Sequence, residues 1–178
     1  MIKPEIVILN SNEQEKFYEQ ILHMLIDADM EFCPPLSMRT STTQSDLAKN
    51  QKYNKGVLNY FEELKKQRFV VACDGSKLLG FVSFRENFVN SEIIDKDLPN
   101  IYISTLIVSA DARGMGITYR MYENLFDTFN NVNVFTRTWS TNISHIKILS
   151  KFGFDIFKII KGDRGEGIDT IYFKKGLK

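Results

Sequence analysis

Two glycines one residue apart stand between the strongest strand signal of the chain and an amphipathic helix. The run of β-branched and aromatic residues at 101–108 predicts a strand. Gly114 and Gly116 let the backbone turn tightly after this strand and leave its amides facing outward. Apolar residues on one helical face follow the turn: Ile117, Met121, Leu125 and Phe129. The segment therefore reads as a strand, a glycine turn and a helix, in that order.

This arrangement predicts a binding site for phosphate or pyrophosphate. The first turn of a helix has unpaired amides and the positive end of the peptide dipole, and both attract anions. The turn lacks the Lys-Ser or Lys-Thr pair of a nucleotide-triphosphate loop, and it lacks the third glycine and later acid of a dinucleotide fold. A different phosphate-bearing cofactor is therefore expected. The alternative is a turn that uses glycine for its geometry alone.

Periodicity predicts further helices and strands on both sides of this segment. A strand at 5–9 comes first, followed by a helix that Ser11 caps and that ends near Asp29. A second helix is expected at 44–66, and Asp74-Gly75-Ser76 joins two strands into a hairpin. The remaining expected elements are the hairpin strands at 69–73 and 78–84, a strand at 132–138, a helix at 142–151, a strand at 154–160, a charged turn at 162–167 and a final strand at 168–174.

Composition limits the size of the protein and its partners. The chain has 178 residues, of which 43% are hydrophobic, and this fits a single domain over residues 1–178. Its 23 Lys and Arg nearly cancel its 22 Asp and Glu, so neither nucleic acid nor membrane is expected as a partner. The two cysteines, Cys33 and Cys73, suggest neither a disulfide framework nor a metal site, and no metal is expected. Without a signal or spanning segment, a cytoplasmic location is favoured; a homodimer is left open.

The glycine turn resembles the central motif of the GNAT superfamily of N-acetyltransferases. That motif runs Leu-x-Val-x-Pro-x-x-(Arg or Gln)-Gly-x-Gly-(Ile or Leu)-(Gly or Ala). The chain departs from it at Ala110, which replaces the proline, and at Thr118, which replaces the final small residue. A second signature of the family, Asn followed by a short helix and Gly-Phe, is matched by Asn142 and Gly153-Phe154. The matching positions of the first motif are Leu106, Val108, Arg113, Gly114, Gly116 and Ile117.

The resemblance implies an α/β fold with a mixed, largely antiparallel central sheet and helices on both faces, and acetyl-coenzyme A (acetyl-CoA) as cosubstrate. The cofactor would lie in the cleft where the fourth and fifth strands diverge. Its pantetheine arm would pair with the amides of Leu106, Ile107 and Val108. Asn142 would lie near the pantetheine, cap the following helix, or do both. The pyrophosphate would be enclosed by Arg113, Gly114, Met115, Gly116, Ile117 and Thr118.

The positions that handle protons depart from the family pattern. Leu149 occupies the position at which these enzymes often have a proton-donating tyrosine, and Arg137 occupies that of a glutamate base. The catalytic residues are therefore left unassigned. The proton donor is then Tyr119, Tyr122, Ser150 or water, or the thiolate leaves without a dedicated acid.

Four acids are candidates to hold the acceptor amine or to relay its proton: Asp27, Asp29, Glu31 and Glu86. The first three precede Pro34-Pro35, in the stretch that commonly lines the acceptor site of this fold. Glu31 and Glu86 are kept as catalytic candidates. An acidic cluster there favours a cationic amine, although each acid taken alone is better explained as part of a solvated helix face.

Three further positions have two interpretations each. Trp139 is either a wall of the acceptor pocket or part of the core. Of His23 and His145, one is expected on the surface and the other beside the cofactor helix, and neither suggests a metal site. Cys33 has no base near it in the sequence, so it is expected to pack rather than to react.

These observations predict an N-acetyltransferase that moves an acetyl group from acetyl-CoA to a primary amine of a small molecule or peptide, by direct transfer within a ternary complex. The alternative is a module that binds acyl-CoA as a sensor without catalysis, for which Leu149 and Arg137 are the best support. A third interpretation is a structural domain that binds phosphate without a coenzyme.

Overall fold

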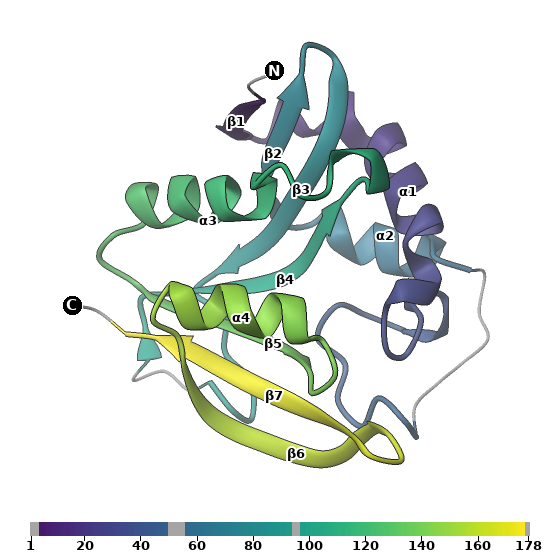
Figure 1. Cartoon of the computed structure of the whole chain (residues 1–178), viewed down its shortest axis with the longest axis vertical. Helices are drawn as coiled ribbons and strands as arrows, with labels where there is room; N and C mark the ends of the chain where they lie inside the picture. The colour runs from purple at the N-terminus through teal and green to yellow at the C-terminus, as the bar shows by residue number, and fades with distance from the viewer. Residues whose placement is uncertain (1–3, 50–55, 94–96, 177–178) are drawn as a thin grey trace.

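The computed structural model describes residues 4–49, 56–93 and 97–176. These residues form a seven-stranded sheet in the order β1-β2-β3-β4-β5-β7-β6, shown in Figure 1. Neighbouring strands are antiparallel except β4 and β5, which are parallel, so the expected mixed, largely antiparallel sheet is confirmed. The strands are β1 (Glu5–Ile8), β2 (Arg68–Asp74), β3 (Lys77–Glu86), β4 (Asn100–Val108), β5 (Asn133–Trp139), β6 (Asp155–Gly165) and β7 (Ile168–Lys175).

Helices cover both faces of the sheet, as expected, because the central strands bury side chains on both sides. In β2, Phe69 and Val71 pack with α1 and α2, whereas Val70 and Ala72 pack with α3 and α4 on the other face. Figure 1 shows these helices around the sheet. The α-helices are α1 (Tyr18–Asp27), α2 (Leu58–Leu64), α3 (Ile117–Thr128) and α4 (Ile143–Lys151), and the 3-10 helices are η1 (Gln14–Phe17), η2 (Asp29–Glu31), η3 (Leu36–Met38) and η5 (Ala110–Ala112).

The sheet divides at its centre, and this division creates the cleft. β4 pairs with β5 from Asn100 to Ile103, and among the described residues the pairing goes no further. At the same point the register of β4 against β3 shifts, because Ser83 faces Thr105 while Phe84 faces Ile103. Ser104 is thus an extra residue in β4, a β-bulge of the kind that bends a strand. Beyond it the two parallel strands separate, as the sequence predicted for the fourth and fifth strands.

The helix expected at 44–66 is wrong over much of its length. α2 covers Leu58–Leu64, and residues 44–49 form turns, while 50–55 lie outside the described residues. The amide of Ala48 donates to the carbonyl of Asp163 (2.7 Å), and the amide of Leu47 donates to its carboxylate (3.4 Å). These two amides donate to a residue of β6 and not to carbonyls one helical turn earlier in the chain. This is why the helical pattern of the sequence gives no helix at 44–49.

Two other local expectations are also corrected. Ser11 does not cap a helix: α1 begins at Tyr18, after η1, and the Asn10 amide donates to the Glu13 carboxylate (3.0 Å). The charged turn expected at 162–167 is mostly strand, because β6 continues to Gly165. Asp163 and Arg164 are buried there (8% and 5% exposed) and bond to neighbouring strands and loops, so their charges do not mark a solvated turn. In the described part of the chain, no helix is long and apolar enough to cross a membrane.

Candidate active site

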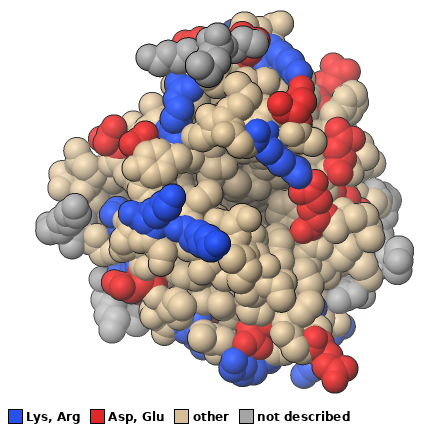
Figure 2. All heavy atoms as spheres, viewed as in Figure 1, with Lys and Arg blue, Asp and Glu red and all other residues tan. Residues whose placement is uncertain are grey.

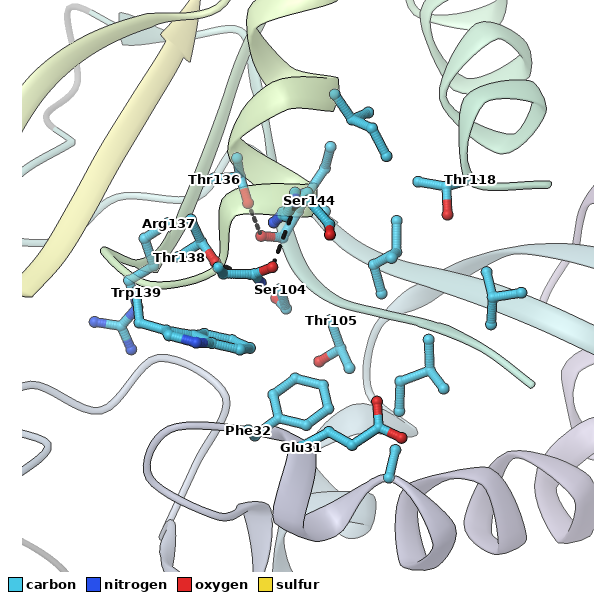
Figure 3. Close-up of a pocket in the computed structure, with 18 of the residues that line it drawn as sticks. Glu31, Phe32, Ser104, Thr105, Thr118, Thr136, Arg137, Thr138, Trp139 and Ser144 are labelled. Atoms are coloured by element: carbon cyan, nitrogen blue, oxygen red, sulfur yellow. Dashed lines mark hydrogen bonds between the residues drawn. The ribbon is translucent and has the colours of Figure 1, made fainter. Parts of the chain in front are cut away.

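A cleft of about 360 Å3 lies where β4 and β5 separate. Figure 2 shows a hollow near the middle of this face, with acidic and basic side chains at its rim. In Figure 3, Glu31 and Phe32 reach the cleft from the segment after α1, and Thr118 faces it from the start of α3. The cleft is thus lined by segments from both faces of the sheet. Its lining includes Ser104, Thr105, Leu106, Ile107, Val108, Arg113, Thr118, Thr136, Arg137, Thr138, Trp139, Asn142, Ser144, His145 and Ile148.

The backbone of β4 presents free amides to this cleft. The Val108 carbonyl accepts a hydrogen bond from Arg113 Nε (3.2 Å), whereas the Ser109 amide donates to Leu79 in β3 (2.9 Å). The amide and carbonyl of one strand residue point to the same side, and alternate residues point to opposite sides. The amides of Val108 and Leu106 therefore face the cleft that β5 has left open. They form a ladder to which an extended ligand with amide groups can add.

The glycine turn lies next to this ladder. Gly114 and Gly116 have φ of 79° and 71°, which an L side chain rarely adopts. A Cβ at either position would meet nothing within 4 Å, so the turn needs glycine for its conformation and leaves open space around its backbone. Gly116 is also the N-cap of α3, and the first amides of this helix lie at the end of the cleft with Thr118. The position suits a phosphate group.

The expected cofactor residues fall into two groups in the structure. Gly114, Met115 and Gly116 are exposed on the turn, and Ile117 is buried against the core (2% exposed). The others line the cleft: Leu106, Ile107, Val108, Arg113, Thr118 and Asn142. The structure therefore brings together the segments from which the sequence predicted a cofactor site; which atoms contact a cofactor stays a prediction.

Arg113 forms an ion pair across the cleft mouth with Glu31. Its Nη2 lies 2.8 and 2.9 Å from the two carboxylate oxygens of Glu31, and both side chains are about half exposed. The side chain of Arg113 is also anchored at the Val108 carbonyl. The pair holds the segment after α1 against the glycine turn. In this structure Glu31 thus neutralises the positive charge of Arg113, which the sequence predicted to bind the pyrophosphate.

Asn142 has the capping role that was one of its two expected roles. Its Oδ1 accepts from the His145 amide (3.3 Å) and its Nδ2 donates to Thr138 Oγ1 (3.0 Å). These bonds fix the start of α4 against the end of β5. Asn142 also lines the cleft, so the cap does not exclude a contact with the cofactor.

A tyrosine–histidine pair lies where the expected proton donor is absent. Leu149 is fully buried among core residues and has no exposure to the cleft. One of the alternatives, Tyr122, is buried and its hydroxyl lies 2.7 Å from His145 Nε2. Burial lowers the pKa of His145 to about 4, so its imidazole is neutral near pH 7. The other side-chain alternatives, Tyr119 and Ser150, are exposed.

His145 lines the cleft and His23 is exposed, as the sequence predicted for one histidine of each kind. What sequence reasoning missed is the partner of His145. The two rings come from positions 23 residues apart on different helices, α3 and α4. Only the packing of these helices brings them together, and no local pattern indicates it.

The acidic candidates do not form one cluster. Asp29 accepts from the amide and the hydroxyl of Ser37 (both 2.7 Å), so it orders the loop after η2. Glu86 pairs with Arg68 and faces Ile101 at the beginning of β4, whereas the cleft lies at the end of β4. This position does not support Glu86 as a catalytic candidate. Glu31 lines the cleft and pairs with Arg113, and Asp27 lines an adjoining pocket together with Glu31. A cationic acceptor at these acids stays a prediction.

An aromatic wall closes the side of the cleft opposite the glycine turn. Phe32 and Trp139 both line the cleft, and their ring centroids are 5.7 Å apart with planes inclined at 49° (Figure 3). Trp139 is therefore part of the pocket wall, one of its two expected roles. Cys33, next to Phe32, is partly buried, and its thiol lies 3.8 Å from the carbonyl of Arg164, in agreement with a packing role.

A mixed sheet whose parallel central strands separate beside a glycine turn and a helix N-terminus defines the class of coenzyme-dependent acyltransferases. The sequence model of the acetyltransferase (GNAT) family matches residues 28–154. The chain belongs to this family, as the motif at the glycine turn indicated. Acetyl-CoA is the cosubstrate of the family, so this expectation from the sequence is confirmed.

Solved structures show the same fold at low sequence identity. An N-acetyltransferase from Staphylococcus aureus Mu50 is 16% identical, with 99% of each chain covered and a TM-score of 0.65. A ribosomal-protein-alanine N-acetyltransferase from Brucella melitensis is 16% identical, with 97% of this chain and 99% of that chain covered and a TM-score of 0.64. A phosphinothricin acetyltransferase from Sinorhizobium meliloti, solved in complex with acetyl-CoA, is 13% identical, with 99% and 89% covered and a TM-score of 0.66. A search of curated proteins found no significant match.

Proposed function

We propose that the chain is an N-acetyltransferase that binds acetyl-CoA in the cleft between β4 and β5 and transfers the acetyl group to a primary amine of a small molecule or peptide. The observation that carries the proposal is the alignment of the free β4 amides with the glycine turn and the α3 N-terminus. The free β4 amides suit an extended arm that contains amide groups. The glycine turn and the α3 N-terminus suit a pyrophosphate. We take residues 1–178 as a single domain, as expected from the length of the chain.

The proposed binding assigns a role to each part of the cleft. The amides of Leu106 and Val108 pair with the pantetheine arm, while Arg113 and the first amides of α3 hold the pyrophosphate. The arm runs from the glycine turn past Val108, so its thioester end lies near the Leu106 amide, which stabilises the oxyanion that forms when the amine attacks. The amine enters from the side of the aromatic wall, past Phe32 and Trp139.

We assign no side chain as general acid or base. Glu31 is engaged by Arg113, and His145, with its pKa near 4, is a weak base at neutral pH. Catalysis then comes from positioning the amine against the thioester and from oxyanion stabilisation by the backbone. The acceptor amine must lose its proton before attack, so the rate should rise with pH until the amine is neutral.

The second candidate function is an acyl-CoA sensor without catalysis. Leu149 favours it, because a fully buried leucine occupies the position of the usual proton donor. Release of free thiol from acetyl-CoA in the presence of polyamines, aminoglycosides, amino acids and peptides separates the two functions. Amine-dependent thiol release supports the enzyme, whereas intact cofactor binding with no release from any amine supports the sensor. Failure to bind acetyl-CoA at all, with no coenzyme detected in the purified protein by mass spectrometry, would exclude both.

A further inference from the structure

Three arginines from distant parts of the chain gather behind the aromatic wall. Arg39 follows η3, Arg137 is in β5 and Arg164 is in β6. Arg39 Nη2 and Arg164 Nη1 both donate to the carbonyl of Cys33, at 3.3 and 2.5 Å, so these two guanidinium groups lie side by side. Arg39 Nε and Nη2 also donate to the carbonyl of Pro34 (3.0 and 2.8 Å).

These positive charges are buried without matching negative charges. Arg39 and Arg164 are 7% and 5% exposed. Within the described residues, none of the three arginines forms a salt bridge; their bonds go to carbonyl and hydroxyl oxygens, including those of Gln44 (2.6 Å) and Tyr172 (3.1 Å) for Arg137. Asp163 is the acid that acts on Arg137 and Arg164, and it bonds to Thr170 Oγ1 (2.5 Å), the same oxygen that accepts from Arg164 Nε (2.9 Å). One carboxylate is thus set against three guanidinium groups.

The electrostatic cost of this arrangement appears in the pKa of Arg164. The pKa of Arg164 is lowered to about 9, mainly by burial and also by the positive charges of Arg39 and Arg137. Burial also lowers the pKa of Arg39, and Arg137 adds to the effect. Burial acts on Arg137 in the same direction, but Tyr102, Tyr172 and Asp163 outweigh it and raise the pKa of Arg137. Buried charges in proteins are normally paired, because an unpaired charge loses its hydration without compensation. The cluster therefore has a net positive charge that a bound anion would compensate.

The cluster adjoins the acceptor side of the cleft. Arg137 lines the cleft itself, and Figure 3 shows its guanidinium group beside Trp139. The guanidinium of Arg164 lies 5.6 Å from the Trp139 ring, and that of Arg39 lies 5.4 Å from the Phe32 ring. A ligand that enters past the aromatic wall therefore meets the positive charge directly, at the end away from the glycine turn.

We propose that the acceptor carries an oxyanion, a carboxylate or a phosphoryl group, which Arg137 binds directly while Arg39 and Arg164 supply the surrounding positive field. The planar guanidinium group binds such oxyanions through two parallel hydrogen bonds. The amine of the same molecule then points along the cleft toward Leu106. This inference rests on the proposed function, and it names an amino acid or amino phosphate, in place of a polyamine, as the acceptor class.

A binding experiment tests the anion site without turnover. The protein is saturated with coenzyme A, so that the pyrophosphate site is filled, and its Tm is measured with acetate, methylphosphonate or chloride at equal ionic strength. Acetate or methylphosphonate should raise Tm by about 3 °C over chloride at about ten times its Kd. The anion with the larger shift identifies the carboxylate or the phosphoryl group. Equal Tm values in all three salts would overturn the proposal.

Variants assign the shift to the cluster. Arg137→Gln should weaken the binding of the effective anion at least about tenfold, the loss of one charge-assisted bidentate contact. Arg68→Gln, which removes an exposed arginine at the start of β2 that pairs with Glu86, is the matched control and should leave the anion effect unchanged. An equal loss in both variants, or no loss in Arg137→Gln, would contradict the assignment. If Arg137→Gln does not fold, Arg137→Lys keeps the charge and should retain a reduced shift.

Acetyl transfer gives a second measurement on the unaltered protein. L-Amino acids and 2-aminoethylphosphonate are compared with their uncharged partners, the amino-acid amides and ethanolamine, by release of free thiol. A kcat/KM at least about tenfold higher for an anionic acceptor supports the inference. Turnover of uncharged or cationic amines alone would refute it while supporting the proposed function. No turnover with any amine would count against the proposed function, and the anion-binding experiment would still decide the inference.

Discussion

Replacing Glu31 with glutamine is expected to tighten the binding of acetyl-CoA. In the unliganded protein, the Glu31 carboxylate holds the guanidinium of Arg113 at 2.8 and 2.9 Å. A pyrophosphate that takes Arg113 must first break this pair, so the pair competes with the cofactor. The Glu31→Gln variant removes the competing charge and leaves the shape of the side chain almost unchanged.

The structure limits the size of this effect. The side chains of Arg113 and Glu31 are 49% and 52% exposed, and exposed pairs of this kind are worth about 0.2 to 1 kcal/mol. The Kd for acetyl-CoA should therefore fall by about 1.4- to 5-fold. Because solvent ions screen exposed pairs, the gain should be larger at low salt and fade as salt rises.

Isothermal titration calorimetry at two salt concentrations measures the change. Glu62→Gln is the matched control. Glu62 forms an ion pair with Lys65 Nζ at 2.8 Å, and it does not line the cleft. In an Arg113→Gln background, Glu31→Gln should have almost no effect, since the pair is already lost. An unchanged or weaker affinity in Glu31→Gln, or an equal gain in Glu62→Gln, would refute the competition.

Three other variants test separate parts of the account. Leu149→Ala should reduce the free energy of unfolding by about 2–5 kcal/mol, because Leu149 is fully buried, and chemical denaturation would show it; a loss below 1 kcal/mol would contradict a core role. Lowering the pH from 6.5 to 4 should reduce the free energy of unfolding by about 3 kcal/mol through His145, since its pKa is about 4 in the folded protein and about 6.5 in the unfolded chain. The free energy of unfolding of His145→Gln should fall less over this range. An equal fall in both proteins would contradict the role of His145. Glu86→Gln should leave kcat/KM for the acceptor unchanged in a thiol-release assay, and a tenfold drop would return Glu86 to the site.

Features that the local backbone determines could be predicted from the sequence. The turn at Gly114 and Gly116 requires positive φ, and the start of α4 uses the capping side chain of Asn142, so both leave a local signature. The β2–β3 hairpin is of the same kind, with Gly75 at φ 57° in its turn. These features place the fold and the region of the cofactor site without knowledge of tertiary contacts.

Features that depend on partners distant in the chain could not be predicted. The helix pattern before α2 failed because Leu47 and Ala48 bond to Asp163, more than a hundred residues away. The acids before Pro34 looked like one cluster, but Ser37 and Arg113 each engage one of them. The arginine cluster likewise combines three segments that share no motif. The acceptor side of the cleft is therefore visible only in the folded chain.

Calorimetric titration of acetyl-CoA into Gly116→Val tests the central claim most directly. Gly116 lies in the proposed pyrophosphate turn, and Gly75 in the β2–β3 hairpin serves as the control, because both have positive φ (71° and 57°) with no atom within 4 Å of an added Cβ. Backbone strain is therefore similar in Gly116→Val and Gly75→Val. We predict saturable binding to the unaltered protein and to Gly75→Val, and at least about tenfold weaker binding to Gly116→Val. Equal affinity in all three proteins would contradict the account.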